Sequence, residues 1–341
     1  MKANIKKVLL IRLGAYGDMI IVTPLLRLLK EHGYHVTLNC NKRGEAIIRH
    51  NPYIDKILLH DESIPNEKLD EHWAELARGY DKVINLSESI EKGLLAVEGS
   101  PEFNLSHEER HKRYNHNYYD RTIKLAGFKE RGLNGELHFT SIEESVFHDF
   151  RTKLAGKFKV IWGLSGSSHH KAYPYVPYAA KAFLNKYPDS VIITVGDDAC
   201  RILEADLDHP RIIRKSGQWS IRKSLLMAKH ANLVISGESA LANAAGCFDV
   251  PKIIILSHSS EENLTKYWQN CINLYGDVPC QPCHQIHYTE ESCPCDGPVV
   301  KGPVCITSLM PGTVMEAMET VYQKWRTNGT DTRNRLSRIS A

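Results

Sequence analysis

The chain contains no long apolar segment, no strong excess of either charge and no close internal repeat. No stretch approaches the roughly 20 apolar residues that a membrane-spanning helix needs. The apolar run at Val8–Ile11 is too short for a signal peptide, and a helix pattern follows it where a cleavage site would stand. The net charge of +3 tolerates an anionic ligand but does not require a nucleic-acid partner. We therefore expect a cytoplasmic protein.

What is present is the composition of an ordinary globular protein, with 42% hydrophobic and 24% charged residues. Because a single core rarely grows beyond roughly 250–300 residues, a chain of 341 residues predicts two domains. The nine cysteines would stay reduced in the cytoplasm. We therefore interpret them as free thiols or metal ligands rather than as a disulfide framework.

In the first part of the chain, short apolar segments alternate with amphipathic ones, which is typical of a parallel sheet with helices between its strands. The expected strands are residues 8–12, 35–40, 54–60 and 82–86, and the expected helices are residues 24–32, 46–51, 67–78 and 118–126. The polar residues 101–117 are predicted to form an exposed loop. Residues 139–157 form a connector in which a helix begins at Ser141.

The same alternation returns in the second part. The expected strands are residues 159–164, 190–195, 232–236 and 252–256, and the expected helices are residues 178–186, 221–228, 239–245 and 311–325. We therefore predict an α/β protein of two Rossmann-like domains, residues 1–150 and 151–326. The second domain includes a Cys-rich segment at 279–306, and residues 327–341 are expected to be a flexible tail.

The most informative segment runs Ile11-Arg12-Leu13-Gly14-Ala15-Tyr16-Gly17-Asp18, a strand end, a Gly-rich turn and an acid. Open α/β sheets bind ligands at the carboxyl ends of their strands, so Asp18 stands where such folds keep their chemistry. The alternative is a turn or helix-capping aspartate, which is common. Gly14 and Gly17 suit a tight turn under either interpretation.

Three segments together resemble glycosyltransferase family 9, the ADP-heptose heptosyltransferases. They are the opening segment with Thr23-Pro24, the Gly/Ser turn 163–168 with Lys171-Ala172-Tyr173-Pro174, and residues 236–245. The resemblance spans about residues 5–325. It implies the GT-B fold, in which two Rossmann-like domains face a central cleft. It also implies transfer of heptose from ADP-heptose to lipopolysaccharide core or, in some members, to protein.

This chain departs from the family pattern in the third segment. Glu238-Ser239-Ala240 stands where the family has Asp-Thr-Gly, and Asn243 stands where it has His. The nucleotide sugar therefore stays open. The Cys-rich segment 280–305 is similar to the iron-binding cluster of protein-modifying autotransporter heptosyltransferases.

The resemblance implies that Asp18 is the base that deprotonates the acceptor hydroxyl in an inverting transfer. Arg12, Gly14 and Gly17 would form the acceptor-side loop around it. A second implied catalytic residue is Lys171, which would neutralise the leaving diphosphate in place of a catalytic metal. The alternative is that Lys171 is a solvated surface lysine with no role in the site.

The predicted donor site combines the two later segments. Backbone N–H groups and hydroxyls of a Gly/Ser turn can hold a pyrophosphate. We expect Glu238 to bond ribose or sugar hydroxyls, because a carboxylate repels phosphate; a helix-capping role is the equal alternative. The donor-binding candidates are Ser165, Gly166, Ser167, Ser168, Glu238, Ser239, Ala240 and Asn243. The pair Gly196-Asp197 and Trp219 are interpreted as turn and core.

Five cysteines fall within residues 280–305, a density that suggests a structural zinc or iron site. The favoured ligands are Cys280, Cys283, Cys295 and Cys305, with Cys293 as the substitute for Cys295 and with His284 and His287 as further candidates. Free thiols in a loop are the alternative. The basic segment His107–Arg121 is interpreted as a solvated loop rather than as a surface for an anionic acceptor.

We therefore predict a metal-independent inverting glycosyltransferase with a nucleotide-sugar donor, such as ADP-heptose, and a glycan or glycolipid acceptor. Protein or modified DNA bases are alternative acceptors. Two rivals from other classes are a non-catalytic nucleotide-sugar-binding homologue and a nucleic-acid-binding module built on the cysteine cluster. Transient contact with a membrane surface and self-association into an oligomer both stay open.

Overall fold

The computed structural model describes residues 5–87, 91–95, 97, 99–168, 171–286, 293 and 302–337. Its first half holds a parallel four-stranded sheet in the order β3-β2-β1-β4. The strands are β1 (Lys7–Ile11), β2 (His35–Cys40), β3 (Lys56–Leu59) and β4 (Lys82–Asn85). Residues 8–11 of the central strand β1 are fully buried, as expected for a strand covered on both faces.

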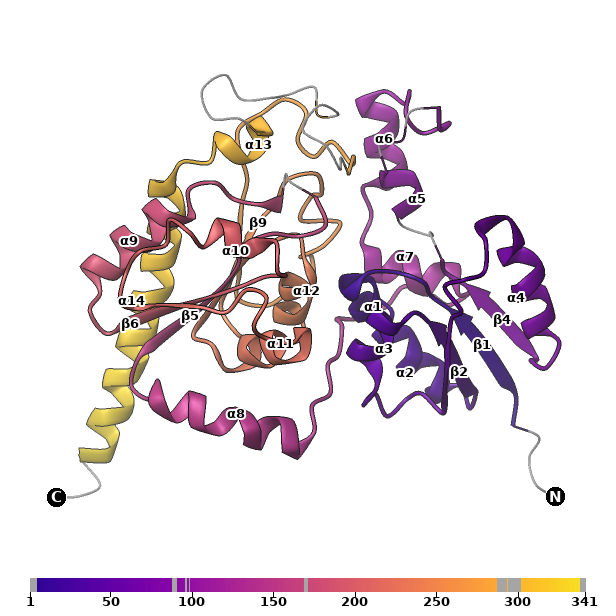
Figure 1. Cartoon of the computed structure of the whole chain (residues 1–341), viewed down its shortest axis with the longest axis horizontal. Helices are drawn as coiled ribbons and strands as arrows, with labels where there is room; N and C mark the ends of the chain where they lie inside the picture. Colours follow the sequence, from indigo (N-terminus) through magenta and orange to yellow (C-terminus); the bar gives the residue numbers. More distant parts are fainter. Residues whose placement is uncertain are drawn as a thin grey trace.

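Helices and one 3-10 turn belong to the same half, with α5 and α6 drawn above the sheet in Figure 1. They are α1 (Tyr16–Ile21), α2 (Thr23–Glu31), α3 (Lys42–Ile48), η1 (Asn66–Lys68), α4 (Leu69–Ala77), α5 (Glu91–Leu94), α6 (His107–Tyr114) and α7 (Tyr118–Leu125). Helix α8 (Ser141–Lys153) then leads into the second half. It begins at Ser141 as predicted, because Thr140 and Glu143 form a capping box.

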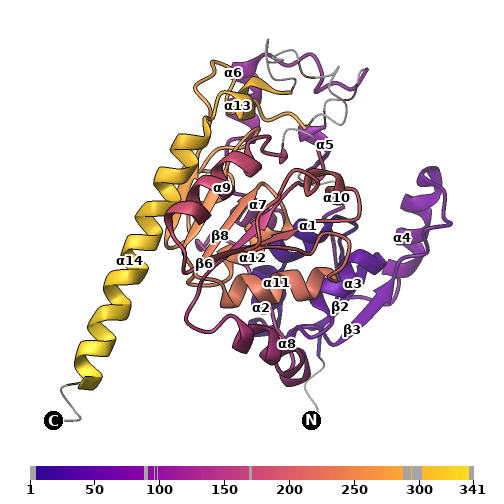
Figure 2. The same cartoon turned by 60° about the vertical axis from the view of Figure 1, so that its left-hand side comes forward.

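The second half holds a parallel six-stranded sheet in the order β10-β9-β8-β5-β6-β7. Its strands are β5 (Phe158–Gly163), β6 (Ser190–Val195), β7 (Ile212–Arg214), β8 (Leu233–Gly237), β9 (Lys252–Ile255) and β10 (Cys271–Leu274). Its helices are α9 (Val176–Lys186), α10 (Cys200–Leu203), α11 (Ile221–His230), α12 (Ala240–Gly246), α13 (Val304–Thr307) and α14 (Pro311–Ser337). Helix α14 runs along the outer side of this half (Figures 1 and 2).

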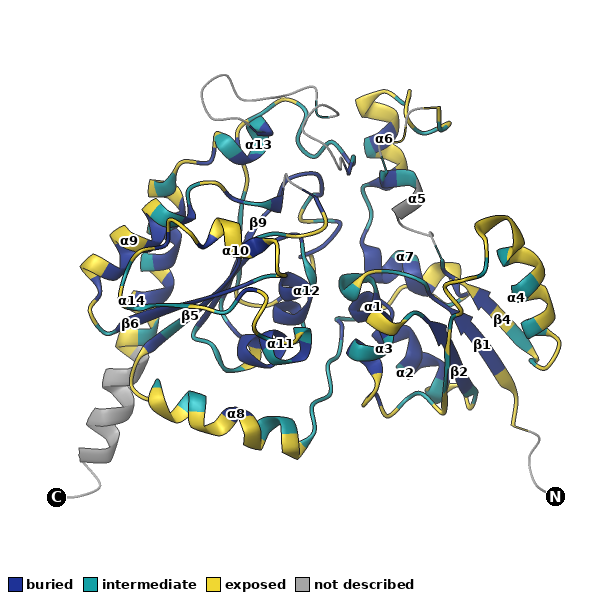
Figure 3. Cartoon of the chain, viewed as in Figure 1, coloured by how far each residue is buried: buried dark blue, intermediate teal, exposed yellow. Residues whose placement is uncertain are grey.

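One apolar core continues from the first half into the second. A single cluster of buried side chains joins Met19 and Leu25 with Leu225 and Ala244. Figure 3 shows buried segments of α1 and α12 facing each other across the boundary. Because the halves share buried apolar surface, separating them would expose that surface to water. Large opening motions are therefore costly.

The structure corrects four expectations about secondary structure. The expected helix 24–32 is confirmed as α2, but a separate helix, α1, precedes it, so Asp18 lies in a helical turn and not in a loop. Residues 107–114 of the expected exposed loop form α6, capped by Ser106 and Glu109. Helix α14 continues to Ser337, into the expected tail. The sequence analysis also missed β7, β10, α10 and α13, which are only three or four residues long.

Candidate functional site

A cavity of about 630 Å³ lies between the two halves, within the usual size range for small-ligand sites. Loops after β1, β5, β6, β8 and β9 line it, at the point where the strand order of the second sheet reverses between β8 and β5. Of the predicted catalytic, acceptor-side and donor-binding residues, the lining includes Gly14, Gly17, Asp18, Ser165, Gly166, Ser167, Lys171, Glu238, Ser239, Ala240 and Asn243. Arg12 and Ser168 are buried nearby and do not line it.

Asp18 is held by two groups of its own segment. One carboxylate oxygen accepts a hydrogen bond from the Ala15 N–H at 2.7 Å, and the other lies 3.1 Å from the Arg12 guanidinium. Arg12 is almost fully buried and also donates to the Leu86 carbonyl at 2.9 Å. At Gly14, an added Cβ would lie 2.7 Å from the Asp18 Cβ. Asp18 is therefore both a capping residue of α1 and a fixed carboxylate at the cavity wall.

Lys171 is buried and reaches the same cavity from the second half. Its Nζ donates to the Ser167 hydroxyl at 3.1 Å. Burial lowers the pKa of Lys171, whereas the carboxylates of Glu238 and Asp18 act in the opposite direction. Gly166 makes room for this side chain, since a Cβ there would lie 2.7 Å from the Lys171 Cδ. Lys171 is thus a cavity residue rather than the solvated surface lysine of the alternative interpretation.

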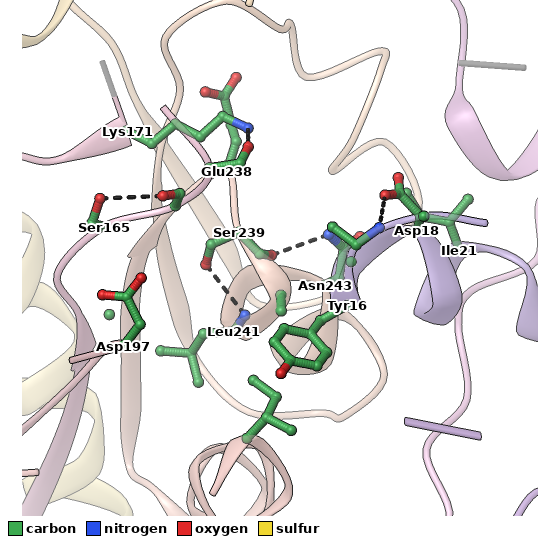
Figure 4. A pocket seen from close by; sticks show the side chains of 18 of the residues that line it. Tyr16, Asp18, Ile21, Ser165, Lys171, Asp197, Glu238, Ser239, Leu241 and Asn243 are labelled. Atoms are coloured by element: carbon green, nitrogen blue, oxygen red, sulfur yellow. Dashed lines mark hydrogen bonds between the residues drawn. The ribbon is translucent and has the colours of Figure 1, made fainter. Parts of the chain in front are cut away.

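Glu238 is buried beside Lys171 (Figure 4), and protein groups surround its carboxylate. One oxygen accepts from the Ser257 hydroxyl and from His258 Nδ1, the latter at 3.0 Å. The other accepts from the Ser259 N–H at 2.8 Å and from the Ser259 hydroxyl. Burial raises the pKa of Glu238, but His258 and Lys171 outweigh it and hold the pKa far below its usual value. The expected contact with ribose or sugar hydroxyls would have to displace one of these partners.

Ser239 and Asn243 form the start of α12 and its contact with the first half. The Ser239 hydroxyl caps the helix by accepting from the Leu241 N–H at 3.2 Å. The Asn243 side chain donates to the Ser239 carbonyl at 3.1 Å and accepts from the Tyr119 hydroxyl at 3.3 Å. A Cβ at Gly17 would lie 3.0 Å from the Asn243 amide nitrogen. Gly17 therefore permits the close approach of α1 and α12.

Several cavity residues were missed from the sequence or have a second position there. Asp197 accepts from the Cys200 N–H and Trp219 packs against the core, as interpreted from the sequence, and both also line the cavity. His258 also lines it and was not considered, because nothing in the sequence around it marks a site. The apolar part of the lining includes Val195, Trp219, Ile221, Leu225 and Leu241. Leu241 and Asp197 lie at the end of the view in Figure 4 opposite to Glu238 and Lys171.

The basic segment His107–Arg121 is not a solvated loop. Arg110, at 1% exposure, donates to the His284 carbonyl at 3.5 Å, and His107 lies 3.1 Å from the Pro282 carbonyl. The segment therefore contacts the backbone of residues 282–284 and connects them to the first half. Its cationic groups are partly used within the protein, which weakens the case for an anionic acceptor there.

The cysteine cluster is only partly described. Burial raises the pKa of the Cys283 thiol to about 12, and nearby Cys280 and Cys293 thiols add to the effect. Burial also raises the pKa of the Cys305 thiol, and the Cys283, Cys293 and Cys280 thiols act in the same direction. Among the described residues, no group of three or more His, Cys, Asp or Glu side chains is placed to hold a metal ion. Cys295 and His287 lie outside the described residues. The predicted metal site therefore stays a prediction.

Within the part of the chain that the structure describes, no helix has both the length and the apolarity needed to cross a membrane. No protein-family model and no curated protein sequence matches this chain.

Solved structures resemble the chain in fold. A family 9 glycosyltransferase from Veillonella parvula DSM 2008 superposes with a TM-score of 0.68, at 16% identity, over 95% of this chain and 99% of its own. The E. coli ADP-heptose lps heptosyltransferase II superposes with a TM-score of 0.66, at 14% identity, over 94% of this chain and 99% of its own. The iron-containing dodecameric glycosyltransferase TibC of enterotoxigenic E. coli H10407 superposes with a TM-score of 0.61, at 12% identity, over 95% of this chain and 78% of its own.

The chain therefore has the GT-B fold of these glycosyltransferases, with two facing Rossmann-like halves. This confirms the predicted α/β class and the fold that the family resemblance implies. TibC has also been solved in complex with ADP-D-beta-D-heptose, and the E. coli heptosyltransferase WaaC with ADP.

Proposed function

We propose that this protein is an inverting, metal-independent glycosyltransferase that moves a sugar from a nucleotide sugar to an acceptor hydroxyl. The observation that carries the proposal is the placement of Asp18 and Lys171 in one cavity between the two halves. Asp18 comes from the first half and accepts the proton of the acceptor hydroxyl. Lys171 comes from the second half and stabilises the negative charge of the departing diphosphate.

The lining supports an order for the parts of the donor. Trp219 and Leu241 line the cavity and pack in the same apolar cluster, which suits a planar base. Hydroxyls of Ser165 and Ser167 with the cation of Lys171 suit a diphosphate. The transferred sugar then lies between the diphosphate and Asp18, where the acceptor hydroxyl must approach.

We propose ADP-heptose as the first donor to test, because the sequence resembles the heptosyltransferases and because TibC and WaaC structures hold ADP-heptose and ADP. A ligand present at 100 times its dissociation constant adds about 2.7 kcal/mol to stability. Melting temperatures should therefore rise with the true nucleotide sugar and rise less for Lys171→Met. If no nucleotide sugar binds, the proposed function is wrong.

For the acceptor we propose a hydroxyl of lipopolysaccharide core or a related glycan, with protein as the second candidate. Incubating the protein and its donor with each acceptor, followed by mass measurement, separates these candidates through the mass of one added sugar. A purely binding homologue would bind nucleotide sugar and release no nucleoside diphosphate with any acceptor.

We also propose a structural zinc or iron ion held by Cys280, Cys283, Cys305 and either Cys295 or Cys293. The Cys280-x-x-Cys283 spacing and the density of cysteines in residues 280–305 support it. A site of four thiolates leaves no open position for substrate, so it would order its segment and take no part in the transfer. We propose a cytoplasmic location, because nine cysteines in one chain suit a reducing compartment.

A further inference from the structure

One wall of the cavity is built from two loops that follow neighbouring strands of the second sheet. Gly196 and Asp197 come directly after β6, and Trp219 and Ile221 come after β7. Because β6 and β7 pair in parallel, both loops leave the sheet at the same edge. Trp219 is the aromatic side chain that the proposed function assigns to the base of the donor, so this wall would receive the nucleoside.

Backbone hydrogen bonds continue the pairing of the two strands into these loops. The Lys215 N–H donates to the Thr194 carbonyl at 2.9 Å, and the Gly217 N–H donates to the Gly196 carbonyl at 3.1 Å. The contact is close, since a Cβ added at Gly196 would lie 3.3 Å from the Ser216 hydroxyl oxygen. A shift of Ser216 would therefore be transmitted to the loop after β6.

A buried carboxylate, Glu204, lies behind the two loops at the end of α10 and is 4% exposed. One of its oxygens accepts from the Thr194 hydroxyl at 2.6 Å, from the Ser216 hydroxyl at 2.7 Å and from the Ser216 N–H at 3.1 Å. Thr194 and Ser216 are themselves fully buried. A single oxygen thus joins the end of β6 to the segment that leads to Trp219.

The charge of Glu204 needs a reason, because burying a carboxylate costs free energy that hydrogen bonds from neutral donors only offset. An apolar side chain would fill the same space without that cost, so stability by itself explains the carboxylate poorly. A binding wall gives a better reason. The lining of such a wall has to be held within about 0.5 Å by supporting hydrogen bonds.

We propose that Glu204 is a positioning residue for the nucleoside part of the donor, because it holds the loops after β6 and β7 at one separation. This inference rests on the proposed function. Glu204 acts through Gly196 and through the segment that leads to Trp219, without touching the ligand. The diphosphate, by contrast, is assigned to Ser167 and Lys171, which follow β5, so its binding should not depend on Glu204.

Two variants grade the loss at Glu204, and a third is the matched control. Glu204→Ala removes all three hydrogen bonds, whereas Glu204→Gln keeps one side-chain oxygen that can accept two of them. The control is Asp189→Ala. Asp189 accepts from the Tyr322 hydroxyl at 2.6 Å and from Arg326 at 3.0 Å, and it precedes β6, at the edge of the sheet opposite to the cavity.

The measurement is calorimetric binding of ADP and of inorganic pyrophosphate, at a temperature where the circular dichroism of each variant matches that of the wild type. We expect Glu204→Ala to weaken ADP binding by about tenfold and Glu204→Gln by about threefold, in line with the number of hydrogen bonds lost. Pyrophosphate should bind both variants like the wild type. Asp189→Ala should bind ADP like the wild type. If Glu204→Ala does not fold, Glu204→Gln decides.

The outcomes separate this inference from the proposed function. The inference is overturned if the Glu204 variants bind ADP like the wild type, if ADP and pyrophosphate weaken equally, or if Asp189→Ala loses as much ADP binding as Glu204→Ala. Where pyrophosphate binds too weakly to measure, the comparison of the Glu204 and Asp189 variants with ADP decides. UDP and GDP replace ADP if the wild type does not bind it. A wild type that binds none of the three contradicts the proposed function itself.

Discussion

The buried Arg222 of α11 connects the two halves, and its removal should destabilise the whole protein. Its guanidinium donates to both oxygens of Glu143, at the start of α8. It also donates to the carbonyls of His138, at 2.7 Å, and Ile47, at 3.1 Å. One side chain therefore links α11 of the second half with α3 of the first and with the connector between them.

Arg222→Met keeps most of the apolar stem, which isolates the loss of these hydrogen bonds. Breaking a buried ion pair by removing one partner costs about 3–5 kcal/mol. The Glu143 side chain is 25% exposed, so water can compensate part of the loss. We therefore expect the free energy of unfolding to fall by about 3 kcal/mol at pH 7, measured by urea denaturation.

The pH dependence provides a second check with a definite sign. The hydrogen bond from Arg222 is the main cause that lowers the pKa of Glu143, from 4.5 to about 2. The stabilisation is therefore complete above about pH 4.5 and is lost as the pH falls toward 2. A shift of this size corresponds to about 3.4 kcal/mol at most, and solvent screening reduces it to about 2. The difference between wild type and Arg222→Met should shrink over the same interval.

The matched control is Arg201→Met, which removes an exposed pair with Asp198 in which both side chains are mostly in water. Exposed pairs contribute about 0–1 kcal/mol, so this variant should stay within about 0.5 kcal/mol of the wild type. The reasoning is refuted if Arg222→Met loses less than about 1 kcal/mol, or if the two variants lose equal amounts.

Three further predictions follow from the site and the core. Asp18→Asn keeps an acceptor for the cap of α1 but removes the base, so nucleotide release in the presence of acceptor should fall by about 10²- to 10⁴-fold while donor binding persists; unchanged turnover would leave only the capping role. Cys283→Ser should lower the zinc or iron content measured by mass spectrometry, whereas a metal-free wild type would rule out the ion. Gly246→Ala places a Cβ about 2.2 Å from the Trp268 ring, and overpacking of this kind should cost about 1–3 kcal/mol in urea denaturation, with a neutral result showing that the ring can move.

How far the sequence predicts each element depends on where its stabilisation comes from. Strands β1, β5 and β8 were predicted because their own residues form apolar runs, as expected for strands of a sheet that is covered by helices on both faces. Strand β7, at Ile212–Arg214, is an edge strand of two half-buried residues and one exposed residue, and its order comes from pairing with β6. Helix α6 has almost no apolar periodicity. Its capping box at Ser106 and Glu109 was the signal that could have located it.

The site divides in the same way. The sequence alone determined that Asp18, Lys171 and Glu238 follow strands of open α/β sheets, since Gly-rich turns and strand ends are local features. Only the tertiary structure decided their surroundings. It placed Arg12 behind Asp18, filled the carboxylate of Glu238 from the loop after β9 and brought His258 to the cavity. The contacts of Glu238 join the end of β8 to the loop after β9, so no local pattern encodes them, whereas Arg12 and Asp18 belong to one segment and only the burial of Arg12 needed the tertiary structure.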